Sequence, residues 1–227
     1  MVLAIFVWVA RFSLYHLSSG ELSLSKRELL LATSNQGKLR EVREILNDLP
    51  FQLLTLSECE SIRPVAETGA TFIENASLKA EGYARQTNLL TLADDSGLEI
   101  EALNGQPGVH SARYMGEDVP YPLRNQSLLA ELQNHDNRAA RFVCSIAIAG
   151  ANGNLLNISS GVCEGRIATQ LRGTGGFGYD PIFIPDGFEL TFGELPAEVK
   201  NRISHRARAL VKAREFLSRL TDGSTAD

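Results

Sequence analysis

Eight consecutive residues combine glycine, aromatic and acidic side chains in a pattern that suits a flat ligand. Residues 173–180 read Gly-Thr-Gly-Gly-Phe-Gly-Tyr-Asp. Glycine has no Cβ, so a backbone rich in it can approach another group closely. Phe177 and Tyr179 offer flat apolar surface, and Asp180 offers a hydrogen-bond acceptor. This chemistry suits a planar heterocycle such as a nucleobase, although a glycine-rich hairpin or bulge with core aromatics would use the same residues.

A pair of carboxylates follows a buried strand that we predict over residues 89–93. The segment 94–97 reads Asp-Asp-Ser-Gly and is predicted to form a tight turn at the strand end. Adjacent carboxylates resist desolvation, but Mg²⁺ binds oxygen ligands of this kind and would offset their charge. Because neighbouring strand side chains point to opposite faces, one Asp would face a metal while the other anchors the turn. A polar turn held by local hydrogen bonds is the alternative.

A polar segment near the start of the chain could hold phosphate. A strand predicted over 28–33 is followed by residues 34–38 and then by a helix with an apolar face. Ser34 or Asn35 could cap this helix. Its free N–H groups would then lie beside Lys38, where an anion binds readily. The segment is not a Walker loop, because the first glycine and the following Ser or Thr are missing. A capped helix with a surface lysine is the alternative.

Polar residues also lie at and near the start of a second predicted helix. Thr71 and Glu74 form a Thr-x-x-Glu capping box, which predicts that a helix begins there. Asn75 and Lys79 are four residues apart and lie together on the border of its apolar face. They either point into a cleft or are solvated. Glu67 precedes this helix in a predicted loop.

The last helix is basic although the chain as a whole is acidic. Residues 200–219 contain seven Lys or Arg against a single acidic residue. Ser204 is a suitable N-cap, and Lys200, His205 and Arg206 lie at or just before the predicted helix start. The positive end of the helix dipole disfavours cations at that place. Their position therefore indicates an anionic ligand, with a merely solvated basic face as the alternative.

The rest of the chain must position these groups. Alternating apolar residues predict strands over 98–102 and 142–148, and a second strand over 155–164 would pair with the latter in a hairpin. A helix is predicted over 124–134. This hairpin is predicted to lie inside or beside the main sheet.

Composition sets the outer limits. The chain has 227 residues, of which 44% are hydrophobic and 22% charged, as in an ordinary globular protein. The net charge of −5 gives no general affinity for nucleic acid. The three cysteines are far apart, which indicates neither a disulfide framework nor a metal site and favours a reducing, cytoplasmic setting.

The two ends of the chain are predicted to lie outside the folded unit. The apolar run at residues 2–10 is too short to span a bilayer and lacks the features of a secretory signal. We therefore expect no membrane attachment. Residues 1–27 are predicted to be a poorly ordered extension, residues 28–221 a single two-lobed domain, and residues 222–227 a tail.

Six segments, in this order, resemble the inosine triphosphate pyrophosphatase family, whose members remove non-standard purine nucleotides. Each segment is a modest signal alone, whereas six in register are highly specific. They are Leu-Ala-Thr-Ser-Asn-Gln-Gly-Lys (31–38), Glu-Thr-Gly-Ala-Thr-Phe-Ile-Glu-Asn-Ala (67–76), Ala-Asp-Asp-Ser-Gly-Leu (93–98), Pro-Gly-Val-His-Ser-Ala-Arg-Tyr (107–114), Gly-Thr-Gly-Gly-Phe-Gly-Tyr-Asp-Pro (173–181) and Ile-Ser-His-Arg (203–206).

The resemblance implies an α/β fold with an elongated mixed β-sheet, flanking helices and two lobes around a central nucleotide-binding cleft. It implies a homodimer that hydrolyses ITP, dITP and XTP to the monophosphate and pyrophosphate with Mg²⁺ as cofactor. Two other interpretations stay open. One is a pyrophosphatase for other modified nucleotides. The other is a nucleotide sensor without catalysis, although the adjacent carboxylates speak against it.

The resemblance also implies roles at the reacting phosphate. Asp95 would be both the Mg²⁺ ligand and the general base that prepares water to attack the α-phosphorus. Glu67 is a further candidate metal ligand, although some relatives carry an acidic residue where Ala66 stands. Independently of the resemblance, the strand and helix patterns make Asp94, Asn75 and Lys79 candidates to support these ligands from behind.

The remaining implied roles concern the substrate. The phosphates would be held by Thr33, Ser34, Asn35, Gln36, Gly37 and Lys38. Ser96 would touch the substrate, and the base would lie against Phe177, Gly178, Tyr179 and Asp180, with Phe177 stacking. Lys200, His205 and Arg206 would bind substrate, the last two near the 6-keto oxygen. A buried donor there is left unpaired by the amino group of adenine, which rejects ATP. Guanine shares the 6-keto group, so its exclusion must rest on the 2-position.

Overall fold

A mixed β-sheet forms the centre of the molecule. The computed structural model describes residues 26–221. Its strands are β1 (Arg27–Leu31), β2 (Phe51–Thr55), β3 (Leu90–Ile100), β4 (Ala139–Ala149), β5 (Leu155–Ile167) and β6 (Phe183–Pro185). They lie in the order β2-β1-β3-β4-β5-β6, with β1 parallel to β2 and β3 and all later neighbours antiparallel. The predicted elongated mixed sheet is confirmed.

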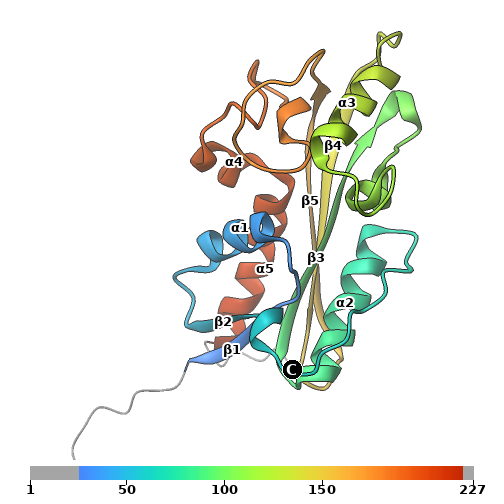
Figure 1. Ribbon diagram of the computed structural model, residues 1–227. Helices are drawn as coiled ribbons and strands as arrows, with labels where there is room; N and C mark the ends of the chain where they lie inside the picture. Colours follow the sequence, from blue (N-terminus) through green and yellow to red (C-terminus); the bar gives the residue numbers. More distant parts are fainter. Residues whose placement is uncertain (1–25, 222–227) are drawn as a thin grey trace, which may run out of the picture.

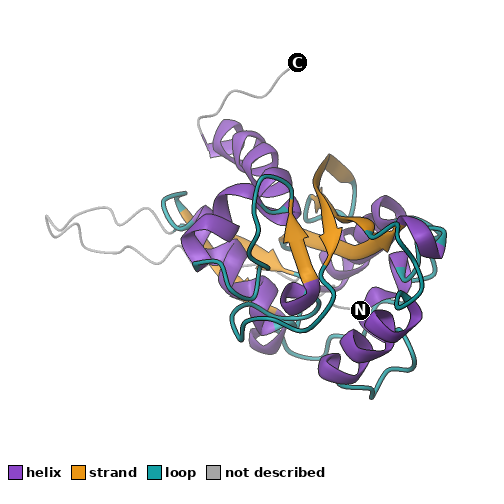
Figure 2. Cartoon of the chain, turned by 90° about the horizontal axis from the view of Figure 1, so that it is seen from above, coloured by secondary structure: helices purple, strands orange, loops and turns teal. Residues whose placement is uncertain are grey.

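Helices cover both faces of this sheet. Figure 1 shows α1 and α5 on one side of the long strands and α2 on the other, and Figure 2 shows the strands enclosed by helices. The α-helices are α1 (Gln36–Leu46), α2 (Phe72–Thr87), α3 (Tyr121–Glu131), α4 (Ala197–Ile203) and α5 (His205–Thr221). Short 3₁₀ helices span Leu56–Glu58, Glu101–Leu103, Gly108–Arg113 and Asp180–Ile182.

Apolar clusters hold these layers together. Leu29 of β1 belongs to the cluster beneath α1 and α5, whereas its neighbour Leu30 packs with Ala80 of α2. The alternation follows from the opposite directions of successive strand side chains. A third cluster joins Phe142 and Phe183 to α3 at the other end of the long strands. Each face of the sheet is therefore buried by helices from distant parts of the sequence.

Local capping signals correctly predicted where two helices begin. The Thr71 Oγ1 accepts a hydrogen bond from the N–H of Glu74, whose carboxylate accepts from the N–H of Thr71. The reciprocal bonds complete the predicted capping box of α2. At α5, the Oγ of Ser204 accepts from the N–H of Ala207. Both caps use donors that the first helical turn leaves unpaired.

The predicted turn at residues 94–97 is wrong. This segment lies inside β3, which joins the two strands predicted over 89–93 and 98–102 into one. The register pairs Asp94 with Ile146 of β4 and continues without a break to Ile100. The polar side chains do not end the strand, because cations from three helices meet the two carboxylates, as described below.

Two other features differ from the prediction, and the ends of the chain are not tested. The helix predicted over 124–134 begins earlier, at Tyr121, directly after Pro120. Lys200, predicted near the start of the last helix, lies within the separate helix α4. The predicted extension 1–27 and tail 222–227 lie outside the described residues, apart from Lys26 and Arg27. Within residues 26–221, no helix is long and apolar enough to cross a membrane.

Candidate active site

One cleft collects most of the predicted site residues. Asp95 and Phe177 both line it, which is the condition for one ligand to reach both. Further walls come from residues that received no role in the sequence, including Ser111 and Tyr121. The predicted residues in its lining are Asn35, Lys38, Glu67, Lys79, Asp95, Ser96, Phe177, Gly178, Tyr179, Asp180, Lys200, His205 and Arg206.

The cleft opens where the pairing of two strands ends. β1 pairs with β3 only over Leu90–Leu92, whereas β4 pairs with β3 along its whole length. Residues 93–97 therefore have a strand partner on one side only. On the open side, the Lys79 ammonium donates to the carbonyl of Asp94 at 2.7 Å. The two carboxylates thus lie beside a gap in the sheet, which leaves room for a ligand.

Asp94 and Asp95 point to opposite faces, as predicted. Asp94 lies 3.0 Å from the Lys38 ammonium and 3.2 Å from the Arg206 guanidinium, and its side chain is almost fully buried. Burial alone would raise the pKa of Asp94, but Lys38, Arg206 and Lys79 outweigh it and hold the pKa well below its usual range. Asp94 is therefore a permanent anion that fixes two cations at the edge of the cleft.

Asp95 has a different environment. Its Oδ1 lies 3.8 Å from the Lys79 ammonium, while its buried Oδ2 has no hydrogen-bond partner among the described residues. Burial raises the pKa of Asp95, and nearby Lys79 and Lys38 offset this only in part. A carboxylate with a raised pKa and a free oxygen can accept a proton more readily than an ordinary aspartate.

The start of α1 is capped by Asn35, one of the two predicted candidates. The Asn35 Oδ1 accepts hydrogen bonds from the N–H groups of Gly37 and Lys38, at 2.9 and 3.1 Å. These two groups are therefore engaged rather than free, which corrects the prediction for them. The N–H of Asn35 donates to Thr33, and the remaining predicted phosphate-binding residues, Ser34 and Gln36, are exposed outside the cleft lining.

The glycine-rich loop presents Phe177 to the cleft. Gly176 and Gly178 have φ values of +69° and +67°, which only glycine adopts without strain. Between them, the N–H of Phe177 donates to the Asp180 carboxylate at 2.7 Å. Asp180 in turn pairs with Lys200, whose ammonium lies 4.5 Å above the Phe177 ring. The loop is thus tied to α4 through a buried carboxylate.

The aromatic residues of the loop serve different purposes. On one side, the Phe177 ring contacts Gly37 so closely that a Cβ there would lie 2.5 Å from a ring carbon. Gly37 lines a second, adjoining cavity behind this ring rather than the cleft itself. Tyr179 is buried, donates its hydroxyl to the carbonyl of Ser111 and packs edge-on against Tyr121. Tyr179 is therefore held in place, whereas the Phe177 ring is partly exposed and has Lys200 and Arg206 over it, 4.5 and 5.6 Å from its centroid.

His205 provides a neutral group in the cleft. Its ring stacks on Phe142 at a centroid distance of 4.6 Å, and its buried Nδ1 lacks a hydrogen-bond partner within residues 26–221. Burial lowers the pKa of His205 well below its ordinary value, and Arg206 and Lys200 lower it further. The imidazole is therefore uncharged at neutral pH, and its unpaired nitrogen can meet a ligand atom.

Glu41 is a site residue that the sequence did not reveal. It lies on α1, is buried, and pairs with Lys200 at 2.9 Å and with Arg206 at 2.5 Å. It thereby connects α1 to Lys200 and Arg206, two cations of the cleft lining. Its position three residues after Lys38 was the signal that could have placed it near the cleft, because this spacing puts both side chains on one side of α1.

Two carboxylates fit a hard divalent cation. Glu67 reaches the Lys79 ammonium at 2.9 Å, and the same ammonium contacts Asp95. The unpartnered Oδ2 of Asp95 is a suitable ligand atom. In the described part of the chain, no group of three or more His, Cys, Asp or Glu side chains could hold a metal. Magnesium commonly uses one or two carboxylates together with substrate phosphates, so this smaller set fits it.

Asn75, predicted to support the metal ligands, lies beside them rather than in the cleft lining. It is fully buried, and its Oδ1 accepts a hydrogen bond from the N–H of Gly69 at 2.8 Å. This bond fixes the loop that carries Glu67. Its Nδ2 is without a partner among the residues the structure describes.

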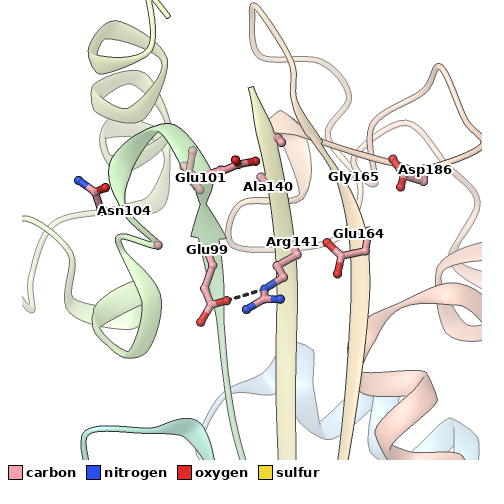
Figure 3. Close-up of a pocket in the computed structure, with 11 residues that line it drawn as sticks. Glu99, Glu101, Asn104, Ala140, Arg141, Glu164, Gly165 and Asp186 are labelled. Carbon is pink, nitrogen blue, oxygen red and sulfur yellow. Dashed lines mark hydrogen bonds and ion pairs between the residues drawn. The ribbon is translucent and has the colours of Figure 1, made fainter. Parts of the chain in front are cut away.

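A larger cavity lies at the far ends of the long strands and has the wrong charge for a phosphate ligand. Figure 3 shows Glu99, Arg141 and Glu164, which the register places side by side on β3, β4 and β5. Arg141 pairs with Glu99 at 2.7 Å, and Glu101 and Asp186 add further negative charge. A polyanion would be repelled there, whereas the cleft around Asp95 is lined by four cations (Lys38, Lys79, Lys200 and Arg206) against three carboxylates (Glu67, Asp95 and Asp180).

The fold and the cleft define an α/β protein whose site combines four cations, three carboxylates and aromatic side chains. The sequence profile of the Ham1 family matches residues 29–216. The chain belongs to this family, and the predicted family resemblance is confirmed.

Named relatives and solved structures cover most of the chain. A dITP/XTP pyrophosphatase of Desulforamulus reducens is 48% identical over 85% of this chain and 96% of its own length. One of Geobacter sulfurreducens is 47% identical over 83% and 96%. A HAM1 protein from Coxiella burnetii superposes with a TM-score of 0.78 at 43% identity, covering 85% of this chain and 98% of that one. The Staphylococcus aureus Ham1 protein gives 0.76 at 40% identity, with 88% and 100% covered.

Proposed function

We propose that this chain hydrolyses the non-standard purine nucleoside triphosphates ITP, dITP and XTP to the monophosphate and pyrophosphate. The observation that carries the proposal is the convergence of Asp95, Lys38 and Phe177 on one cleft. A base, a countercharge for phosphates and a stacking ring are what such a substrate requires. Relatives called dITP/XTP pyrophosphatases match the chain over nearly their whole length, which supports the same activity.

In the proposed reaction, Asp95 is the general base. One oxygen of its carboxylate would accept the proton of the water that attacks the α-phosphorus, while the other would remain available to the metal. In the metal-free protein, burial raises the pKa of Asp95 and so strengthens the carboxylate as a base, whereas a bound divalent cation would lower this pKa. Mg²⁺, held by Asp95 and Glu67, would neutralise phosphate charge and orient the α-phosphoryl group when bound. Lys38 would stabilise the negative charge on the departing pyrophosphate.

Recognition of the base would combine stacking with a hydrogen bond. Phe177 would stack on the purine, and the unpaired Nδ1 of His205 would donate to the 6-keto oxygen in the tautomer that carries its proton there. The amino group of adenine would leave this donor unpaired, which rejects ATP. Arg206 is held in place by Asp94, Glu41 and Ser96 and supports the same side of the pocket.

The proposal also covers the oligomeric state and the cellular location of the protein. We propose a homodimer, because Leu155, Leu156 and Ile158 form an exposed apolar group on β5. We place the protein in the cytoplasm, in keeping with its three free cysteines. Residues 28–221 would act as a single two-lobed domain with neither nucleic acid nor membrane as partner.

The experiment is a substrate panel. Pyrophosphate release by the full chain is measured with ITP, dITP, XTP, ATP and GTP, with and without Mg²⁺. We expect Mg²⁺-dependent release from the first three only. Asp95→Asn should lower kcat by about 10²–10⁴-fold, as loss of a general base does. Asp48→Asn, which changes an exposed carboxylate paired with Arg214, is the control. Equal turnover of ATP and ITP, or full activity of Asp95→Asn, would refute the assignment.

A further inference from the structure

Lys79 occupies the space between the two carboxylates that fit a metal. Its ammonium donates to the Asp94 carbonyl at 2.7 Å, lies 2.9 Å from Glu67 Oε1 and 3.8 Å from Asp95 Oδ1. The side chain is only 10% exposed. An ammonium has three N–H donors, and here it faces three oxygen atoms. Lys79 therefore takes the place that a cation would take between these groups.

The protein offers a divalent cation little else. Within residues 26–221, acidic, histidine and cysteine side chains form no group of three that could hold a metal. Glu67 is further engaged by Arg113 at 3.8 Å. A cation entering the nucleotide-free enzyme would meet two carboxylates that are already neutralised, and it would be repelled by the nearby ammonium. A triphosphate would supply the additional oxygen ligands that the protein lacks.

We propose that Lys79 is a built-in counter-cation, which prevents the nucleotide-free enzyme from holding a divalent metal until triphosphate oxygens are present. The inference rests on the proposed function and adds an order of binding to it. Lys79 acts through Glu67 and Asp95 and is therefore a positioning residue. Its flexible four-carbon stem allows the ammonium to leave the two carboxylates while the helix stays in place.

A merely structural role makes a different prediction. If Lys79 only tied the Glu67 loop to α2, its loss would loosen both carboxylates and weaken metal binding. If it is a counter-cation, its loss frees the carboxylates and strengthens metal binding. The affinity of the nucleotide-free enzyme for a divalent cation therefore changes in opposite directions in the two cases.

The test measures Mn²⁺ binding to the full chain without nucleotide, from the electron paramagnetic resonance signal of free Mn²⁺. Lys79→Gln should bind Mn²⁺ about 10- to 100-fold more tightly than wild type, the range that residues supporting a metal site commonly span. Arg85→Gln is the matched control, because it removes one positive charge from the same helix and breaks contacts with Glu81 and the Gly153 carbonyl, neither of which lines the cleft. It should leave the affinity unchanged. Adding Asp95→Asn to Lys79→Gln should abolish the gain.

Either of two results would overturn the proposal. One is a Lys79→Gln variant that binds Mn²⁺ no more tightly than wild type. The other is a gain that persists in the double variant, because the cation would then lie elsewhere. Thermal unfolding checks that each variant folds, and Lys79→Met, which keeps the apolar stem, replaces Lys79→Gln if that variant does not. The measurement involves no turnover, so it can succeed or fail independently of the substrate panel.

Discussion

Replacing Glu41 with glutamine tests whether the buried charges beside the cleft stabilise the fold. The Glu41 carboxylate is 11% exposed and pairs with both Lys200 and Arg206. Burial alone would raise the pKa of Glu41, but Arg206 and Lys200 outweigh it, so the pKa lies below its ordinary value. The carboxylate is therefore ionised at neutral pH and balances charge on two buried cations.

The expected loss of stability depends on which carboxylate partners Lys200 and Arg206 keep when Glu41 is replaced. Removing one partner of a buried ion pair costs about 3–5 kcal/mol, because the remaining charge is left uncompensated. Here Lys200 keeps Asp180 and Arg206 keeps Asp94. We therefore expect the lower end of the range, a decrease of about 3 kcal/mol in the free energy of unfolding.

Urea denaturation at neutral pH, followed by far-UV circular dichroism, measures this loss. Glu44→Gln, an exposed position on the same helix, is the control and should change stability by less than about 0.5 kcal/mol. The pH dependence adds a second check. Because the folded-state pKa of Glu41 is lowered, its contribution is complete above the ordinary value of 4.5 and is lost as the pH falls through the folded-state pKa. The gap between wild type and Glu41→Gln should therefore shrink in acid. The reasoning would be refuted by a loss of stability as small as that of Glu44→Gln, or by a stability difference between wild type and Glu41→Gln that does not change with pH.

Two further predictions concern the stacking ring. Phe177→Ala should raise the KM for ITP while changing the unfolding transition little, because base stacking on an aromatic ring contributes about 1–3 kcal/mol to binding. The KM is measured from steady-state pyrophosphate release, and an unchanged value would argue against stacking. Gly37→Ala should also raise this KM, because the new Cβ would lie 2.5 Å from the ring and force it to move. In the double variant the two effects should not add, since both act through the same ring; full additivity would contradict the proposed contact.

Signals that depend on neighbouring residues were read correctly from the sequence. The capping box placed the start of α2, and Ser204 placed the start of α5. The alternation of apolar residues found β4 and β5 and their antiparallel pairing. These features follow from hydrogen bonds or side-chain directions within a few residues, which a sequence displays directly.

Features that depend on distant partners were missed. Glu41 looks like a solvated residue on an amphipathic helix, and its burial depends on Arg206, 165 residues later. The same limit explains the wrong turn at residues 94–97. A polar run inside a strand is unfavourable until buried cations meet it, and those cations come from α1, α2 and α5. Local preference therefore predicted a break that tertiary contacts remove.

The unbroken course of β3 has a consequence for turnover. Asp95 lies midway along a strand that pairs with β4 without a break from Thr91 to Ile100. Glu67 and Phe177, in contrast, reach the cleft from connecting segments between regular elements. Substrate entry and product release can thus reshape the surroundings while Asp95 keeps its position, because displacing it would require disrupting the sheet itself.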